Sequence, residues 1–534
     1  MLEARLHRVD RDAMDRFPAA IEQLAADYPE RRKPDRRAFL LLAAAALLIT
    51  AGLLVYSETM AFVWDEGFHL LAAQLIIAGK RPYIDFCFPQ TPLNAYWNAG
   101  WMSVFGESWR VVHVFAALAT AGAMFLTAEF VFTRFGVERW RLACALVAMF
   151  FVGLNTNVVE FGPVGQAYGM CLFLTVAAFR MAVFAARREG VLSALGSGIL
   201  AGTAAACSLL TAPVAPVLLI WLVFYNRQGY RWRKLTAFVA GISIPFAPVL
   251  WMFAEAPRQV FFNVIQYQAI YRRVNWTGAT PHDVDVLSAW LVSSQGLLMG
   301  LLGIAGSVFI LKRSNWERER RAEFLLCIWL TVALTAYIAT AHPTFERYFL
   351  FVVPFLGILA AVGLYDVSSR LFGPDRFRWP AAALMLIVTL ALGRALFDDR
   401  DSVTWYDYQK IAKKVAAVTP ANGRLYADEL VYFLLQRIPP PGMEFSYAHK
   451  LELPPAQEKL YHIVSEKELA QQVKAGQFAT VQSCNDDTID KLGLDQIFPH
   501  KADVLDCTVY WGTVKPQPAT PPAKPSQAAP RAKR

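Results

Sequence analysis

The chain has 534 residues, of which 56% are hydrophobic, and its formal net charge is +9. A composition this apolar excludes an ordinary soluble protein of this length and predicts several membrane spans. The basic residues gather at the ends of apolar segments, which is typical of membrane topology and argues against nucleic-acid binding. We therefore expect a multi-pass protein of the inner (plasma) membrane.

Residues 1–37 are polar and end in a basic cluster directly before the first apolar segment. The positive-inside rule predicts that this segment is cytoplasmic, and such a cluster also favours contact with anionic lipid. The first apolar segment begins too late and runs too long for a cleaved signal peptide. The cluster comprises Arg31, Arg32, Lys33, Arg36 and Arg37.

Eleven apolar segments are predicted to cross the membrane, although the third and sixth are shorter than the roughly 20 residues that a bilayer needs. Lys and Arg are concentrated in every second loop, so the loop after the first span and the C-terminus are both expected outside. The predicted spans are 38–58, 109–132, 142–154, 164–185, 191–210, 211–225, 235–254, 288–311, 323–341, 347–366 and 379–397.

The outer loop at 59–108 carries two adjacent carboxylates, Asp65 and Glu66. Apolar residues at helical spacing predict an amphipathic helix over 67–79 that lies in the membrane interface. Three prolines shape the rest of the loop, which also holds Lys80, Arg81 and Asp85. A long loop with both charge signs favours a functional site. The alternative is a pair of solvated charges at a helix end.

Three further loops, at 155–163, 255–287 and 342–346, share the predicted outer face, and Arg347 opens the span that follows the last of them. A cation in that position either extends to water or holds a negative group such as a lipid phosphate. His342 is expected to be a polar residue at a helix end, because no second His stands at metal-ligand spacing nearby. The other candidate residues of these loops are Glu160, Tyr267 and Arg272.

Residues 398–515 carry more charge and shorter apolar runs, which predicts a small extracytoplasmic α/β domain. We expect helices at 402–417, 428–437 and 465–475 and strands at 424–427, 479–483 and 507–512. Cys484 and Cys507 lie in this domain and could pair in an oxidising compartment. The tail at 516–534 is rich in Pro, Ala and Lys and is predicted to be disordered.

The acidic loop resembles that of the GT-C membrane glycosyltransferases, in particular glycosyltransferase family 39 with its protein O-mannosyltransferases and aminoarabinose transferases of lipid A. The resemblance extends loosely to about residue 397. One departure is clear: the aminoarabinose transferases carry a lysine just before the proline of the Pro-Leu region, and this chain has none there. The matching residues are Asp65-Glu66, Gly79, Pro82-Tyr83, Asp85-Phe86, Pro92-Leu93, Tyr96-Trp97, Arg347-Tyr348 and Pro354.

The resemblance implies a mainly α, polytopic GT-C fold with about 11 transmembrane helices, a catalytic outer loop at 59–108 within a membrane domain at 38–397, and a small C-terminal α/β domain. It also implies inverting transfer of a sugar from a polyprenyl-phosphate donor to an acceptor hydroxyl of a lipid, glycan or protein. Asp65 would be the general base, and Glu66 would orient the acceptor or support Asp65. Arg347 would face the donor phosphate, with Lys80 or Arg81 in reserve.

Further residues are expected to contact the acceptor or another part of the substrate, and they are Asp85, Gln90, Glu160, Tyr267, Arg272 and His342. We expect no cofactor. A divalent cation held by Asp65 and Glu66 is an alternative, but two carboxylates are a minimal ligand set.

Two other classes of function fit the spans. A lipid or glycolipid transporter or flippase would place ionisable residues near the middle of the membrane, whereas the charged candidates here lie at the outer ends of the spans. A non-catalytic scaffold would leave the acidic loop unexplained. The glycosyltransferase hypothesis accounts for both features.

Overall fold

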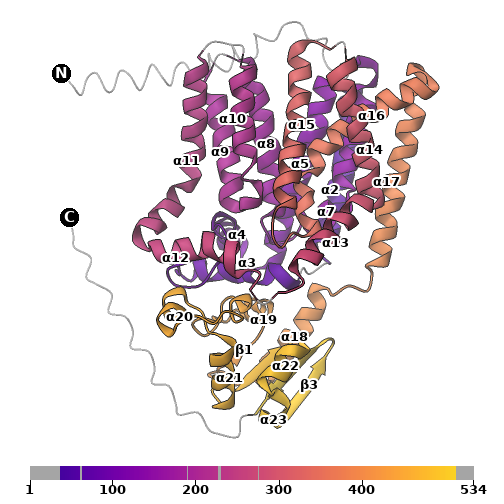
Figure 1. Cartoon of the computed structure of the whole chain (residues 1–534). Coiled ribbons are helices and arrows are strands. Elements are labelled where there is room, and N and C mark those ends of the chain that lie inside the picture. Colours follow the sequence, from indigo (N-terminus) through magenta and orange to yellow (C-terminus); the bar gives the residue numbers. More distant parts are fainter. Residues whose placement is uncertain are drawn as a thin grey trace, which may run out of the picture.

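The computed structural model describes residues 36–59, 63–188, 190–226, 230–274, 276–314 and 316–512. It consists of a long helical bundle and a small α/β unit that lies against one end of the bundle (Figure 1). The predicted disordered tail at 516–534 and the predicted cytoplasmic segment, apart from its last two residues, lie outside the described residues.

Each of the eleven predicted spans coincides with a helix of the bundle, and eight described helices are long and apolar enough to cross a membrane. Three helices, α6, α9 and α10, are shorter, with 13, 16 and 12 residues, whereas α14 reaches 19 residues with its helical continuation to Lys312. The eleven helices are α2 (Arg36–Ser57), α5 (Trp109–Arg134), α6 (Arg141–Gly153), α8 (Tyr168–Arg187), α9 (Leu192–Cys207), α10 (Val214–Tyr225), α11 (Arg231–Glu255), α14 (Ser294–Val308), α15 (Arg318–Ala339), α16 (Val353–Phe372) and α17 (Arg378–Asp398).

Two predicted spans begin at the wrong place. The span expected at 347–366 starts at Val353, because Pro354 in the first turn favours a helix start there. The preceding residues form a 3₁₀ turn, η5 (Glu346–Phe351), so Arg347 precedes the span instead of opening it. The span expected at 288–311 is divided into α13 (Ala279–Val292) and α14 by Ser293, whose hydroxyl caps α14 by accepting a hydrogen bond from Gly296 N at 3.1 Å.

The helix predicted at 67–79 is also corrected at its start. Helix α3 (Val63–Ile77) contains Asp65 and Glu66 in its first turn, where unpaired backbone N–H groups favour negative charge. Gly79 follows the helix in a left-handed conformation with φ +83°. Helix α3 and helix α4 (Leu93–Phe105) lie across the end of the bundle, between it and the α/β unit (Figure 1).

The α/β unit contains a four-stranded sheet in the order β1-β2-β4-β3, in which only β1 and β2 pair in parallel. Three strands match the predicted ones, and β3, which pairs with β4 as an edge hairpin, was not predicted. The disulfide Cys484–Cys507 joins the end of β2 to the start of β4. The elements are α18 (Trp405–Val418), β1 (Leu425–Tyr426), α19 (Glu429–Leu434), α20 (Pro455–Tyr461), α21 (Glu466–Lys474), β2 (Thr480–Ser483), α22 (Asp486–Leu492), α23 (Leu494–Ile497), β3 (His500–Val504) and β4 (Cys507–Trp511).

The α/β unit and the acidic loop share one hydrophobic core. The rings of Trp109 and Trp405 stack with their centroids 4.7 Å apart, and Phe68 of α3 meets Phe445 edge-on at 5.0 Å. At Gly67 the backbones of α3 and α19 approach so closely that a Cβ would lie 3.1 Å from the Cβ of Glu429. The acidic loop is therefore packed between the helical bundle and the α/β unit, and this packing fixes the position of Asp65.

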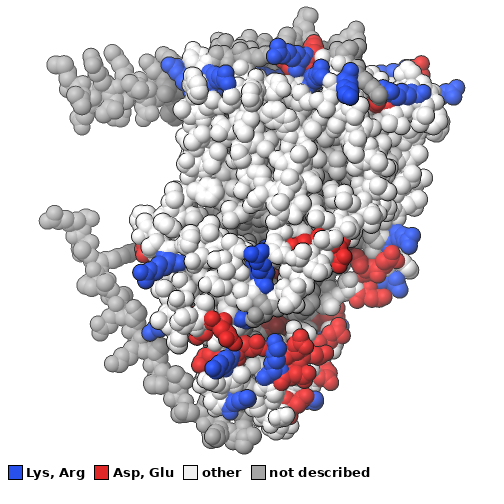
Figure 2. All heavy atoms as spheres, in the orientation of Figure 1, with Lys and Arg blue, Asp and Glu red and all other residues white. Residues whose placement is uncertain are grey.

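Charged residues divide between the two ends of the bundle (Figure 2). Lys and Arg line the edge far from the α/β unit, a nearly uncharged band follows, and most Asp and Glu in view lie over the α/β unit and the adjoining bundle end. This distribution is the one that the positive-inside rule predicts for a bundle whose basic end is cytoplasmic.

Candidate active site

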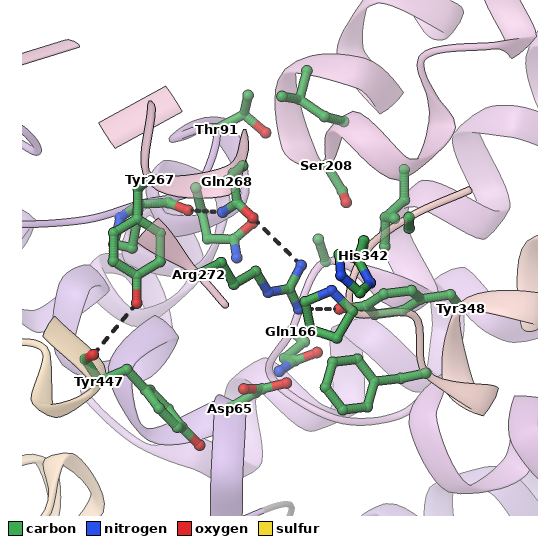
Figure 3. A pocket seen from close by; sticks show the side chains of 18 of the residues that line it. Asp65, Thr91, Gln166, Ser208, Tyr267, Gln268, Arg272, His342, Tyr348 and Tyr447 are labelled. Carbon is green, nitrogen blue, oxygen red and sulfur yellow. Dashed lines mark hydrogen bonds between the residues drawn. The ribbon is translucent and has the colours of Figure 1, made fainter. Parts of the chain in front are cut away.

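A cavity of about 930 Å³ lies at the end of the bundle where α3 and the α/β unit meet. Polar side chains from segments far apart in the sequence surround this space (Figure 3). Its wall comes from the first turn of α3, the loop before α4, the start of α8, the π-helical segment η3 (Phe262–Tyr271), the end of α15, the turn before α16 and residues 445–450 of the α/β unit.

Asp65 lines the cavity and forms an ion pair with Arg347, whose Nη2 lies 2.6 Å from Asp65 Oδ2. Arg347 is held in turn, because its Nε donates to the hydroxyl of Tyr168 at 3.1 Å and its guanidinium lies 4.1 Å from the centre of the Phe345 ring. Within the described parts of the chain, no group hydrogen-bonds Asp65 Oδ1. One oxygen of the carboxylate is thus anchored, and the other is available to a substrate.

Glu66 points away from the cavity and is fully buried. Its Oε1 accepts a hydrogen bond from Gly165 N at 2.5 Å and contacts Nε2 of the buried His113. Nδ1 of the same ring lies 2.6 Å from the carbonyl oxygen of Ser57, so both ring nitrogens face acceptors and both carry protons. Glu66 and His113 therefore form a buried ion pair that ties α3 to α5.

Arg272 also lines the cavity, on the same side as Asp65 in Figure 3. Its Nη2 donates to the hydroxyl of Tyr348, and its Nη1 lies 3.4 Å from Gln268 Oε1. Both partners are neutral, and no carboxylate of the described residues pairs with Arg272. The cavity thus holds a cation whose charge is not balanced locally.

Lys450 brings a second cation from the α/β unit to the same part of the wall. Its Nζ donates to the main-chain carbonyl oxygen of Arg272. Burial and the neighbouring Arg272 lower the pKa of Lys450 below its usual range.

Two histidines also face the cavity. Burial lowers the pKa of His69 to about 4, so its ring is neutral at physiological pH. His342 contacts Asp283 through Nδ1, and Asp283 also accepts a hydrogen bond from Thr344 N at 2.7 Å. His342 is thus oriented by Asp283 at the rim of the cavity, as expected for a polar residue at a helix end.

No group of three or more His, Cys, Asp or Glu side chains in the described residues is arranged to hold a metal ion. Asp65 and Glu66 diverge, since one carboxylate faces the cavity and the other is enclosed by His113 and Gly165. A divalent cation held by this pair is therefore not supported by the geometry.

The cavity brings together several of the residues singled out from the sequence, namely Asp65, Gln90, Tyr267, Arg272, His342 and Arg347. It does not include Lys80, Arg81 or Asp85. Arg81 pairs instead with Asp85, and with Glu255 at 2.8 Å, on the exposed surface of the loop. The expectation that these three residues serve the substrate is not met by their positions.

Glu160 also lies outside the cavity, in the short helix α7 (Thr156–Phe161). Burial, together with the nearby carboxylates Asp399 and Glu346, raises the pKa of Glu160 to about 8. Asp399, directly after the end of α17, has the larger effect of the two carboxylates on the pKa of Glu160. Glu160 therefore packs within the end of the bundle and does not line the cavity.

Some residues of the site could not be identified from the sequence pattern. Tyr348 follows Arg347 directly and is one of the residues that carry the resemblance, but its hydroxyl meets Arg272, 76 residues earlier in the chain. Tyr168 and Lys450 are single polar residues within apolar or mixed segments, and only the tertiary fold shows that they face the cavity. His113 lies on an apolar helix, where a satisfied core histidine is the usual interpretation.

No protein-family model and no curated protein sequence matches the chain. Solved structures do resemble it in fold. The crystal structure of ArnT from Cupriavidus metallidurans in the apo state superposes with a TM-score of 0.63 and 15% identity, over 88% of this chain and 97% of that chain. The structure of the same ArnT bound to undecaprenyl phosphate gives a TM-score of 0.62 and 14% identity, over 90% of this chain and 99% of that chain. These similarities confirm the fold predicted from the sequence: the chain is a polytopic membrane protein with the GT-C fold of membrane glycosyltransferases.

Proposed function

We propose that the chain is an integral membrane glycosyltransferase that moves a sugar from a polyprenyl-phosphate donor to an acceptor hydroxyl. One observation carries the proposal: a carboxylate, Asp65, and a cation, Arg272, that forms no ion pair with a carboxylate of the described residues share one cavity at the end of the bundle. The GT-C fold supports it, since the similar ArnT structure contains undecaprenyl phosphate.

Arg272 is the group that we assign to the donor phosphate. Its hydrogen bonds to Tyr348 and Gln268 fix the guanidinium without neutralising it, and a fixed guanidinium suits the oxygens of a phosphate. Arg347, which the sequence favoured for this role, is paired with Asp65 at 2.6 Å. Its charge therefore serves to hold the carboxylate in place.

Asp65 is the proposed general base. The acceptor oxygen attacks the anomeric carbon of the sugar while the bond from that carbon to the phosphate oxygen breaks, and the bonding electrons leave with the phosphate. The proton of the acceptor hydroxyl passes to Asp65, for which Oδ1 is available. A single displacement of this kind inverts the anomeric centre, and it needs no carboxylate nucleophile and no metal ligand set.

The remaining polar groups of the cavity wall are suited to the hydroxyls of the sugar and the acceptor. Gln90, Tyr267 and His342 line the same cavity as Asp65 and offer hydrogen-bond donors and acceptors. The acceptor would be a lipid, a glycan or a protein hydroxyl. Since the cavity lies at the end opposite the basic loops (Figure 2), we place the reaction on the extracytoplasmic face of the inner membrane.

The transporter alternative is less well supported. It requires a binding site with ionisable groups near the middle of the spans. The charged residues of this cavity lie instead on α3, on the turn before α16 and on the loops that contact the α/β unit.

The test of the donor site uses two neighbouring arginines. Arg272 lines the cavity, whereas Arg273 is exposed and does not. We expect Arg272→Gln to weaken binding of undecaprenyl phosphate to the purified protein about 10- to 100-fold, because a hydrogen bond to a charged group contributes about 1.5–3 kcal/mol. Arg273→Gln should bind as the wild type does. Equal affinities of the two variants would contradict the assignment, and absence of binding to the wild type would contradict the proposed donor class.

A further inference from the structure

The α/β unit closes one side of the cavity through a single segment, residues 445–450. Phe445 packs between Phe68 and Tyr267, with ring centroids 5.0 and 5.6 Å away. The hydroxyl of Tyr267 lies 3.5 Å from the carbonyl oxygen of Tyr447, and Lys450 Nζ reaches the carbonyl oxygen of Arg272. The segment is thus docked on η3, which directly precedes the proposed phosphate ligand Arg272, and on α3, which carries the proposed base.

The charges on the cavity wall do not balance. The wall contains three cations, Arg272, Arg347 and Lys450, against a single carboxylate, Asp65. Asp65 is already paired with Arg347, and the two histidines do not change the sum, because His69 is neutral and His342 is paired with Asp283. Arg272 and Lys450 together therefore leave an excess of two positive charges in a partly buried space.

The excess of two positive charges matches the charge of the leaving phosphate better than the charge of the intact donor. A polyprenyl-phosphate sugar is a phosphodiester and carries one negative charge. When the bond to the anomeric carbon breaks, the phosphate oxygen takes the electron pair and the product becomes a phosphomonoester with a second ionisation near pH 6. One cation is enough for the donor, and a second is useful only as the second negative charge develops.

We propose that Lys450 is this second cation and that the α/β unit, by supplying it, completes the active site. The inference rests on the proposed function. Lys450 would contact the leaving phosphate beside Arg272 and would stabilise the transition state and the product more than the ground state, which is the kind of interaction that raises the rate of the chemical step. Burial and the neighbouring Arg272 both lower the pKa of Lys450, and a bound phosphate would offset both effects.

The inference is tested with two ligands that differ by one negative charge and one methyl group at the phosphate. Undecaprenyl phosphate and its methyl phosphodiester carry the same chain, and at pH 8 the first is a dianion and the second a monoanion. The wild type should bind the monophosphate at least tenfold more tightly than the diester. Lys450→Gln should bind the diester normally and lose most of this preference, whereas Lys450→Arg should retain it.

Lys474 provides the matched control, since it is an exposed lysine of the same unit at the end of α21. Lys474→Gln should keep the wild-type preference. Equal wild-type affinities for the two ligands, or a full preference retained by Lys450→Gln, would overturn the role of Lys450 and leave the donor class intact. Failure of the wild type to bind either ligand would instead overturn the proposed function.

Discussion

Removing the carboxylate of Glu66 is expected to destabilise the fold, because Glu66 has a structural role although it lies next to Asp65 in the sequence. Glu66 and His113 are both buried, with side-chain exposures of 0% and 1%. In Glu66→Ala, the His113 cation would lose its counterion and the N–H of Gly165 would lose its acceptor. Deleting one partner of a buried ion pair costs about 3–5 kcal/mol, and we expect a loss of stability of that size.

Glu66→Gln should behave differently. The amide oxygen can take the place of Oε1 and accept both from Gly165 N and from the Nε2–H of a neutral His113. The ring nitrogen Nδ1 then carries no proton, and its hydrogen bond to the carbonyl oxygen of Ser57 is lost. Because the pair becomes neutral but loses one buried hydrogen bond, we expect a cost of about 1–3 kcal/mol, which is below that of Glu66→Ala. Turnover of this variant should stay within about tenfold of the wild type.

The assay combines thermal unfolding of the purified protein with transfer activity for the same preparations. Glu58 is the matched control, because it pairs with Arg110 at 2.8 Å while both side chains are about 40% exposed. An exposed pair contributes about 0–1 kcal/mol, so Glu58→Ala should shift the unfolding temperature little.

Two results would refute this reasoning. If Glu66→Ala unfolds at the wild-type temperature, the buried pair is not a structural contact of the expected strength. If Glu66→Gln folds normally but loses turnover by 10²-fold or more, Glu66 takes part in proton transfer and its role is not structural.

Three further predictions concern the α/β unit, the bundle end and the topology. The Cys484–Cys507 disulfide closes a loop with a sequence separation of 23, so Cys507→Ser should lower stability by roughly 3 kcal/mol. Non-reducing mass mapping should find the linked peptides, and two free thiols would reject the pair. Burial and a nearby carboxylate raise the pKa of Glu160 to about 8 from a usual value of 4.5. The folded state therefore binds the proton more tightly, and stability should fall as the pH rises from about 4.5 to 8; Glu160→Gln should flatten that fall, and an unchanged pH profile would contradict the burial. Cysteines introduced at Thr59 and Lys474 should react with an impermeant reagent in intact cells, and labelling only after membrane disruption would reverse the topology.

The spans were predictable because a long apolar run with basic residues at one end is the pattern that a bilayer imposes on a crossing helix. Their exact starts were not, since Pro354 and the capping hydroxyl of Ser293 act locally within apolar sequence. The α/β unit was recognised from its composition, but the hairpin strand β3 was missed because its exposed edge carries little apolar pattern.

The site was predictable only in part. Asp65 and Arg347 were both singled out, yet their ion pair joins residues 282 positions apart and depends on the tertiary fold. Arg81 was a reserve candidate for the donor phosphate because it lies near Asp65 in the sequence, whereas the loop folds so that Arg81 meets Glu255 on the surface. Lys450 is remote in the sequence and near in space, and no local pattern marks such a residue.

The central claim is tested most directly by measuring transfer in membranes supplied with radiolabelled undecaprenyl-phosphate sugars and a panel of lipid, glycan and protein acceptors. With the wild type, the label should move to one class of acceptor in the presence of excess chelator. Asp65→Asn keeps the size of the side chain but removes its basic lone pair, so transfer should fall about 10²–10⁴-fold while undecaprenyl phosphate still binds. Near-normal turnover by correctly folded Asp65→Asn, or no transfer by the wild type to any acceptor, would contradict the account.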